Sequence, residues 1–230
     1  MMDLSSLNEM QQLAVTTTEG AVMVMAGAGS GKTKVLTFRI AYLIESLGIN
    51  PYNILAVTFT NKAAKEMKER VEKLLDMNVN RLWISTFHSF CARFLRKEIK
   101  VLGKYRNDFI IIDEDDALKI LKEEMKDKEF HLTPKDALNL ISLAKNDEAL
   151  PEMSSFERSE FDTVYRLYHE HLLRENLLDF DDLISLLKNL AQKLWNVEIH
   201  KFFTPIPNKF STRSLISLAA LLVNVTAKIL

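Results

Sequence analysis

Apolar positions in the first hundred residues follow two kinds of pattern. Short, largely uncharged runs predict buried strands, and they lie at residues 21–25, 53–59 and 81–85. Apolar residues at helical spacing predict helices, and these lie at residues 7–15, 34–47, 60–71 and 90–99. The resulting strand–helix–strand–helix–strand order is typical of a parallel sheet wrapped by helices, so an α/β fold class is predicted here.

Residues 104–190 have a different composition. They contain no glycine, and Pro134 and Pro151 are their only prolines, which favours helices. The expected helices cover residues 115–130, 156–175 and 179–194, and one more begins at Thr133-Pro134, where a capping threonine precedes a proline. Asp179, Asp181 and Asp182 fall in a first helical turn. The helix dipole favours carboxylates there, and this structural role is preferred to a catalytic one.

The stretch Ala-Gly-Ala-Gly-Ser-Gly-Lys-Thr at residues 26–33 stands between an apolar run and a helical pattern. In that context a glycine-rich turn aims backbone N–H groups into one concavity, and the helix N-terminus favours a polyphosphate. Lys32 is expected to reach the β and γ phosphates of a nucleoside triphosphate, and Thr33 to place its hydroxyl on Mg²⁺. The alternative is a turn without a ligand. The predicted nucleotide-binding residues are Ala26, Gly27, Ala28, Gly29, Ser30, Gly31, Lys32 and Thr33, with Lys32 and Thr33 also assigned to catalysis.

The carboxyl ends of the predicted strands bring further candidates together. Residues 26–33, 59–62 and 86–89 are expected at this edge of the sheet, where ligands of parallel sheets gather. Phe59 can stack on a base, whereas Thr60, Asn61 and Ser89 can hold phosphate or sugar. Core packing is the alternative for Phe59. For His88 a hydrogen-bonded loop histidine is preferred to a nucleic-acid contact.

Gln11 has two interpretations. Asn8 and Gln11 have the spacing of a helix capping box, which residue spacing alone favours. The second interpretation places the Gln11 amide against adenine, because its donor and acceptor match N7 and N6 of that base.

Charge and cysteine content narrow the protein class. The 230 residues carry a formal net charge of −1, so any nucleic-acid surface must be local. The single cysteine, Cys91, excludes a disulfide framework and is expected to be a buried structural thiol. No basic–apolar leader is apparent, and the longest apolar run, residues 215–223, is too short to span a bilayer. We therefore expect a cytoplasmic protein with no membrane partner.

Five segments in order carry a resemblance to a known family. They are Leu-Asn-x-x-Gln (7–11), the phosphate loop (26–33), Thr-Phe-Thr-Asn-Lys-Ala-Ala (58–64), Ser-Thr-Phe-His-Ser (85–89) and Leu-Asp-Phe-Asp-Asp-Leu (178–183). Over about residues 4–190 the chain resembles UvrD/Rep-type superfamily 1 DNA helicases. The resemblance implies ATP-driven 3′–5′ movement on single-stranded DNA and unwinding of duplex DNA, with Gln11 at adenine. It also implies nucleotide contacts from Lys34, where relatives often carry arginine, and from Arg70, and DNA contacts from Phe59, Thr60, Asn61, His88 and Ser89.

The resemblance also implies a domain organisation. A RecA-like P-loop NTPase motor domain is expected at residues 1–100, an all-helical inserted subdomain at 101–190, and a divergent tail at 191–230. The family's Asp-Glu-x-Gln-Asp segment does not follow residue 190, so we expect a truncated or frame-shifted product. Residues 109–114, Phe-Ile-Ile-Ile-Asp-Glu, are similar to the apolar strand ending in Asp-Glu that holds Mg²⁺ in phosphate-loop ATPases. They precede the insertion and lack the Gln-Asp, so a strand leading into a helix is preferred.

Three functional hypotheses remain at this stage. The first is the ATP-binding amino-terminal portion of a DNA helicase. The second is a fragment that binds nucleotide or single-stranded DNA without hydrolysing ATP. The third is a small kinase with a phosphate loop, which residues 58–64 and the helical segment argue against.

Overall fold

The computed structural model describes residues 2–79, 82–126 and 128–198. Contacts between residues divide the chain into two compact units, Met1–Phe90 and Cys91–Leu230. The division falls inside helix α4 (Phe87–Glu98), and the domain boundaries expected at residues 100 and 190 stay predictions. Most of the expected tail, with its apolar segment at 215–223, lies outside the described residues, as does Arg81.

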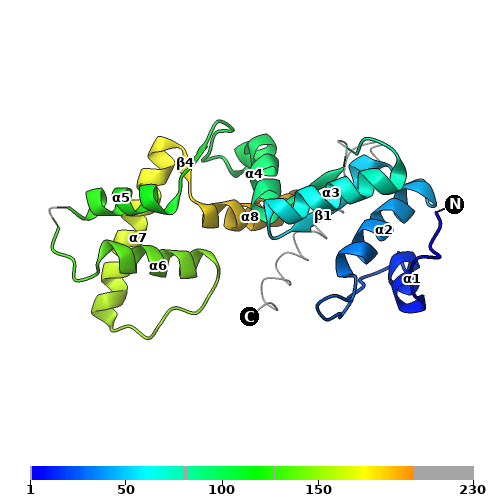
Figure 1. Ribbon diagram of the computed structural model, residues 1–230. Helices are drawn as coiled ribbons and strands as arrows, with labels where there is room; N and C mark the ends of the chain where they lie inside the picture. Colours follow the sequence, from blue (N-terminus) through cyan, green and yellow to red (C-terminus); the bar gives the residue numbers. More distant parts are fainter. Residues whose placement is uncertain (1, 80–81, 127, 199–230) are drawn as a thin grey trace. The chain divides into compact units, whose positions relative to one another are not determined.

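The first unit is built on a two-stranded parallel sheet. Strands β1 (Leu55–Thr58) and β2 (Trp83–Thr86) pair in register from Leu55↔Trp83 to Thr58↔Thr86. The helices of this unit are α1 (Glu9–Thr16), α2 (Lys32–Glu45), the short 3₁₀ helix η1 (Pro51–Asn53) and α3 (Asn61–Leu75), followed by the start of α4 (Figure 1). Apolar residues of α2, α3 and the segments that lead into the two strands form its core, namely Ile40, Ile54, Met67, Val71, Val79 and Leu82. The predicted helices and the second and third strands are thereby confirmed.

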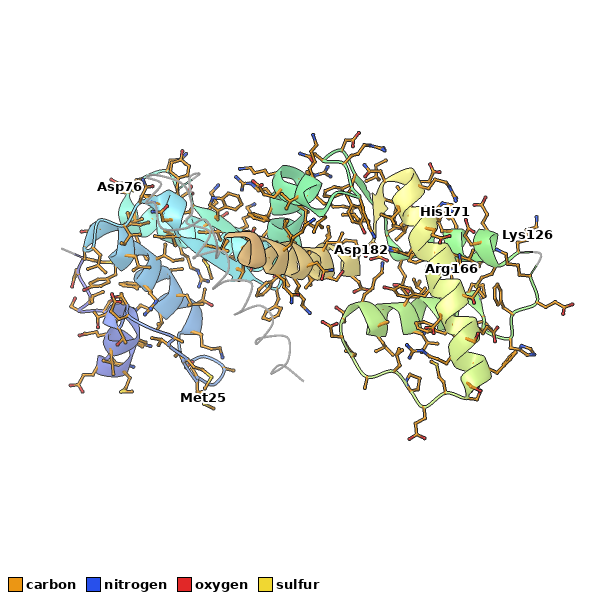
Figure 2. The ribbon with its side chains drawn as sticks, turned by 180° about the vertical axis from the view of Figure 1, so that it is seen from behind. Met25, Asp76, Lys126, Arg166, His171 and Asp182 are labelled. Atoms are coloured by element: carbon orange, nitrogen blue, oxygen red, sulfur yellow. The ribbon has the colours of Figure 1, made fainter. Side chains whose placement is uncertain are left out.

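The strand predicted at residues 21–25 is absent. This segment is irregular and exposed, with 83% of Met23 and 86% of Met25 accessible to solvent, and Met25 lies out on the loop in Figure 2. A strand needs a neighbour for its backbone hydrogen bonds, and among the described residues β1 and β2 pair only with each other. The apolar pattern is compatible with a buried strand, but it does not indicate whether a neighbouring strand is present to pair with it.

The second unit is mainly helical but not all-helical. Its elements are η2 (Ile99–Leu102), β3 (Ile110–Ile111), α5 (Glu114–Met125), α6 (Pro134–Lys145), α7 (Ser155–Glu175), β4 (Leu177–Leu178) and α8 (Phe180–Glu198). β3 and β4 pair in parallel, which corrects the all-helical prediction, because β4 is only two residues long and gives no readable periodicity. Asp113 caps α5 by accepting a hydrogen bond from the Asp116 backbone N–H at 2.9 Å, so the strand-to-helix interpretation of residues 109–114 is confirmed.

The core of this second unit lies among α5, α6 and α7. Leu121, Ile141, Val164, Tyr168 and Leu172 are each no more than 1% exposed there. No helix in the described part of the chain is long and apolar enough to cross a membrane.

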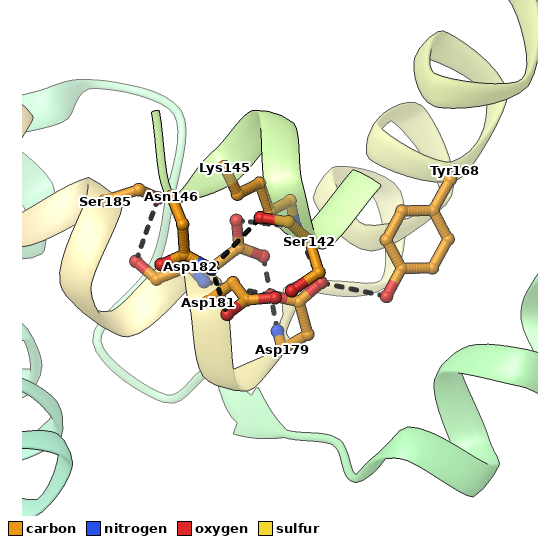
Figure 3. A network of polar contacts seen from close by, with 8 residues as sticks. All are labelled: Ser142, Lys145, Asn146, Tyr168, Asp179, Asp181, Asp182 and Ser185. Carbon is orange, nitrogen blue, oxygen red and sulfur yellow. Dashed lines mark hydrogen bonds and ion pairs between the residues drawn. The ribbon is translucent and has the colours of Figure 1, made fainter. Parts of the chain in front are cut away.

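A buried polar network ties α6, α7 and the start of α8 together (Figure 3). Lys145 Nζ lies 2.6 Å from Oδ2 of Asp179 and 2.8 Å from Oδ1 of Asp182. The Tyr168 hydroxyl donates to Asp179 Oδ2 at 3.0 Å. The Asp182 backbone N–H donates to Asp179 Oδ1 at 2.9 Å, so Asp179 also caps α8. These contacts confirm the structural role that was preferred for the carboxylates.

One ammonium faces two carboxylates in this network. The pKa of Asp182 is raised to about 6, chiefly by burial and further by Asp179, while Lys145 opposes the shift. Burial lowers the pKa of Lys145, but the two carboxylates outweigh it and the net shift is upward. Because the pKa of Asp182 is higher in the folded chain, its protonation contributes to the free energy of unfolding. This contribution is fully present below the ordinary pKa of 3.8 and is lost as pH rises through about 6. The contribution of Lys145 is fully present below its ordinary pKa of 10.5, and so at neutral pH.

Candidate nucleotide and DNA site

The phosphate loop closes around its own lysine. Lys32 Nζ donates to the carbonyl oxygens of Ala26 at 2.8 Å and Gly27 at 2.9 Å, and Ser30 Oγ donates to Gly27 O at 2.7 Å. Gly29 and Gly31 have φ values of +76° and +84°, which L side chains rarely adopt, so glycine is required at both turns. The structure thus places the Lys32 ammonium against the loop backbone, next to the N-terminus of α2.

The N-terminus of α2 is suited to an anion. Gly31 occupies the N-cap position without a side-chain hydrogen bond, and the first turn contains no acidic residue. The first N–H groups of a helix have no partner within the helix and, with the dipole, favour a phosphate. Thr33 is exposed in this turn, which fits a Mg²⁺ ion that takes few protein ligands besides phosphate oxygens. Among the described residues no group of three or more His, Cys, Asp or Glu side chains is arranged to hold a metal ion.

Gln11 combines the capping role with a contact to the loop. Its backbone N–H donates to Asn8 Oδ1 at 2.9 Å and its Oε1 accepts from the Asn8 backbone N–H at 3.2 Å, which confirms the capping box. Its Nε2 donates to the Ser30 carbonyl at 3.0 Å. The amide therefore lies beside the phosphate loop, and its contact with adenine stays a prediction.

Lys34 and Arg70 lie in different settings. Lys34 Nζ donates to the Ser6 carbonyl at 2.6 Å and lies 5.6 Å from the centre of the Phe38 ring. Arg70 pairs with Glu66 on α3 at 3.7 Å, and about half of each side chain is exposed. No hydrogen bond or ion pair of the described residues brings Arg70 to the phosphate loop. The predicted nucleotide contacts of both residues stay predictions.

The two strand ends come together as the sequence predicts. Thr58 and Thr86 are register partners at the ends of β1 and β2, and the rings that follow them, Phe59 and Phe87, lie 5.8 Å apart. Phe59 is 76% exposed, so it is not a core residue. Phe87 was missed by sequence reasoning, although its position directly after the paired strand was a usable signal.

Polar residues lie next to this aromatic pair in the sequence, of which Phe59 is exposed and Phe87 half-buried. Thr60 caps α3 by accepting from the Ala63 backbone N–H at 3.1 Å, and Asn61 is exposed in the first turn. On α4 the Ser89 hydroxyl accepts from Thr86 Oγ1 at 2.8 Å, and His88 is half-buried. Exposed aromatic and polar groups at one sheet end can stack a base and hold the backbone of a single strand.

Cys91, further along α4, is buried. Burial raises the pKa of its thiol to about 12. A thiol that stays protonated at neutral pH is a poor nucleophile, so Cys91 is a structural thiol as predicted.

Comparison with known proteins identifies the family. A family model described as the UvrD/REP helicase N-terminal domain matches residues 7–212. The chain belongs to this family. The match includes every predicted site residue and extends past residue 190, where the recognisable sequence motifs end. Membership also decides against the small-kinase hypothesis.

The individual relatives are bacterial helicases. The ATP-dependent DNA helicase PcrA of Bacillus subtilis (strain 168) is 49% identical over 189 residues, which cover 79% of this chain and 25% of that protein. The PcrA of Staphylococcus epidermidis (strain ATCC 12228 / FDA PCI 1200) is 45% identical over 199 residues, which cover 83% of this chain and 27% of that protein. The chain thus spans about a quarter of the length of these relatives.

Proposed function

We propose that this chain is the ATP-binding amino-terminal portion of an ATP-dependent 3′–5′ DNA helicase motor with a RecA-like arrangement. The observation that carries the proposal is the phosphate loop itself. Lys32 is held on the Ala26 and Gly27 carbonyls at the N-terminus of α2, with the Gln11 amide hydrogen-bonded to Ser30 on the same loop. Membership of the UvrD/REP family and the PcrA relatives support the assignment to DNA helicases.

ATP is expected to replace the internal contacts of the loop. Lys32 exchanges two neutral carbonyl acceptors for the charged β and γ phosphate oxygens, which form stronger hydrogen bonds. The N–H groups at the start of α2 bind the phosphates, and the Thr33 hydroxyl holds Mg²⁺. Bound Mg²⁺ neutralises charge that develops on the transferred phosphoryl group. Gln11 contacts the adenine edge, and Lys34 and Arg70 contribute further nucleotide contacts.

Single-stranded DNA is expected to bind at the ends of β1 and β2. Phe59 offers an exposed ring to a base and is backed by Phe87, while Thr60, Asn61 and Ser89 hold the backbone. His88 adds a contact at the start of α4. Residues 101–190 contact duplex DNA in this proposal, as the family resemblance implies.

The alternative is a chain that binds nucleotide and single-stranded DNA without turnover. It describes these residues acting on their own, which span about a quarter of the length of the PcrA relatives. Rapid phosphoryl transfer requires further positive charge at the transition state, which motor enzymes commonly bring from a second element. The two functions are separated by ATP turnover measured with and without single-stranded DNA. DNA-stimulated turnover supports the helicase motor, and binding without turnover supports the alternative.

The DNA half of the proposal is tested by Phe59→Ala. We expect the affinity for single-stranded oligothymidylate to fall about tenfold, because loss of one base-stacking aromatic costs roughly 1–3 kcal/mol. Fluorescence anisotropy with a labelled oligonucleotide measures the change. Tyr52→Ala is the control, since Tyr52 is an exposed aromatic residue of η1 outside the proposed DNA contacts. Equal affinities of wild type and Phe59→Ala would contradict the proposed DNA surface.

A further inference from the structure

Helix α1 contains Gln11 but is too short to be stable without contacts to the rest of the unit. It has eight residues, and isolated helices below about 12 residues are marginal in water. Its last turn contains no basic residue to complement the helix dipole. Leu7 and Val15 are buried against Val35 and Phe38 of α2, so packing fixes one side of the helix. Its ends require other contacts.

Arg39 of α2 supplies the contact at the C-terminal end. Its Nη1 donates to the carbonyl oxygens of Ala14 at 2.7 Å and Thr17 at 2.6 Å. The Ala14 carbonyl is among the last four of α1, and these carbonyls accept no hydrogen bond from a backbone N–H of the same helix. A cation at this end also complements the helix dipole. At the other end, Lys34 Nζ binds the Ser6 carbonyl at 2.6 Å. Two cations of α2 thus hold both ends of the segment that carries Gln11.

This arrangement links the phosphate loop to the expected base contact. Helix α2 begins at Lys32, directly after the loop, and Gln11 Nε2 reaches Ser30 at 3.0 Å. A Cβ added at Gly31 would lie 3.0 Å from Gln11 Nε2, so the amide is closely fitted to the loop backbone. A small displacement of α1 would therefore move the amide away from a base whose phosphates stay in the loop.

We propose that Arg39 is a positioning residue for recognition of the nucleotide base. By binding the end of α1 to α2, it keeps the Gln11 amide at the distance from the phosphate loop that an adenine nucleotide requires. Arg39 itself touches neither base nor phosphate. The inference rests on the proposed function, namely that ATP binds at residues 26–33.

The test compares ATP with inorganic tripolyphosphate, which has no base. In the full chain, Arg39→Met is expected to lower ATP affinity about tenfold, the effect of losing the roughly 1 kcal/mol hydrogen bonds between the displaced Gln11 amide and the base, and to change tripolyphosphate affinity by less than about twofold. Isothermal titration calorimetry measures both. Arg39→Lys keeps a charged donor and is expected to recover most of the ATP affinity. Arg166→Met, at an exposed arginine of α7, is the matched control and is expected to leave both affinities unchanged.

A double-mutant cycle separates positioning from a general structural role. Gln11→Ala is expected to remove the preference for ATP over tripolyphosphate, and Arg39→Met added to it is expected to change the preference no further. Equal loss of both ligands in Arg39→Met, including loss through misfolding that Arg39→Lys does not restore, would overturn the assignment of Arg39. A further loss of preference in the double variant would also overturn it. If the unmutated chain binds neither ligand, the proposed function fails, and this assignment fails with it.

Discussion

Replacing Lys32 with alanine is expected to weaken binding of Mg·ATP about a hundredfold. The ammonium is the one group of the phosphate loop that brings a full positive charge to the phosphates, and hydrogen bonds to charged partners are worth about 1.5–3 kcal/mol each. In the structure this ammonium already makes two hydrogen bonds to Ala26 and Gly27, so it lies at the loop before nucleotide arrives. Isothermal titration calorimetry with ATP and Mg²⁺ measures the change.

Two further variants test whether the loss of ATP affinity in Lys32→Ala comes from the charge at this position. Lys32→Arg keeps the charge on a planar group and is expected to bind with intermediate affinity. Lys119→Ala removes an exposed lysine of α5 and is expected to bind ATP as the wild type does. Unchanged ATP affinity in Lys32→Ala would show that the loop is not the nucleotide site.

Replacing Lys145 with methionine is expected to destabilise the second unit by roughly 3–5 kcal/mol. The change leaves the carboxylates of Asp179 and Asp182 buried without their cation, and breaking a buried ion pair from one side costs about this much. Even with Lys145 in place, the network sets two carboxylates against one ammonium. Urea denaturation gives the free energy of unfolding, and hydrogen exchange of the α6 and α7 amides locates the loss.

Neutralising the two carboxylates is expected to restore part of the stability that Lys145→Met removes. Asp179→Asn and Asp182→Asn, added to Lys145→Met, remove the uncompensated charges. Lys119→Met is the control, because the ion pair of Lys119 with Asp116 is exposed and surface pairs contribute little. If Lys145→Met unfolds at the same urea concentration as Lys119→Met, the network does not hold the helices together.

Local sequence patterns predicted the local elements of the chain better than the pairing of its strands. The glycine-rich loop, the capping box of Asn8 and Gln11, and the strands expected at residues 53–59 and 81–85 follow from local patterns, and the structure contains all three features. The strand expected at residues 21–25 does not form, because strand pairing depends on a neighbour that no local pattern describes. The pairing of β3 with β4 was missed for a related reason, since it joins two-residue segments far apart in the sequence.

Long-range polar contacts were also beyond the sequence. Arg39 lies in an amphipathic pattern that showed only a helix, and nothing nearby indicated its contacts with Ala14 and Thr17, more than twenty residues away. Lys145 falls in the last turn of a helix, where a charge alone is unremarkable, whereas its partners Asp179 and Asp182 lie at the start of another helix. Such contacts depend on how helices pack, which spacing within one helix does not determine.

The most direct test of the nucleotide site is a crystal structure of the chain with Mg²⁺ and a non-hydrolysable ATP analogue. We expect the triphosphate in the loop at residues 26–33, with Lys32 Nζ moved from the Ala26 and Gly27 carbonyls to the β and γ phosphates. Mg²⁺ is expected on the Thr33 hydroxyl, and the Gln11 amide at the adenine edge. A nucleotide bound elsewhere, with Lys32 still on the two carbonyls, would contradict the proposed site.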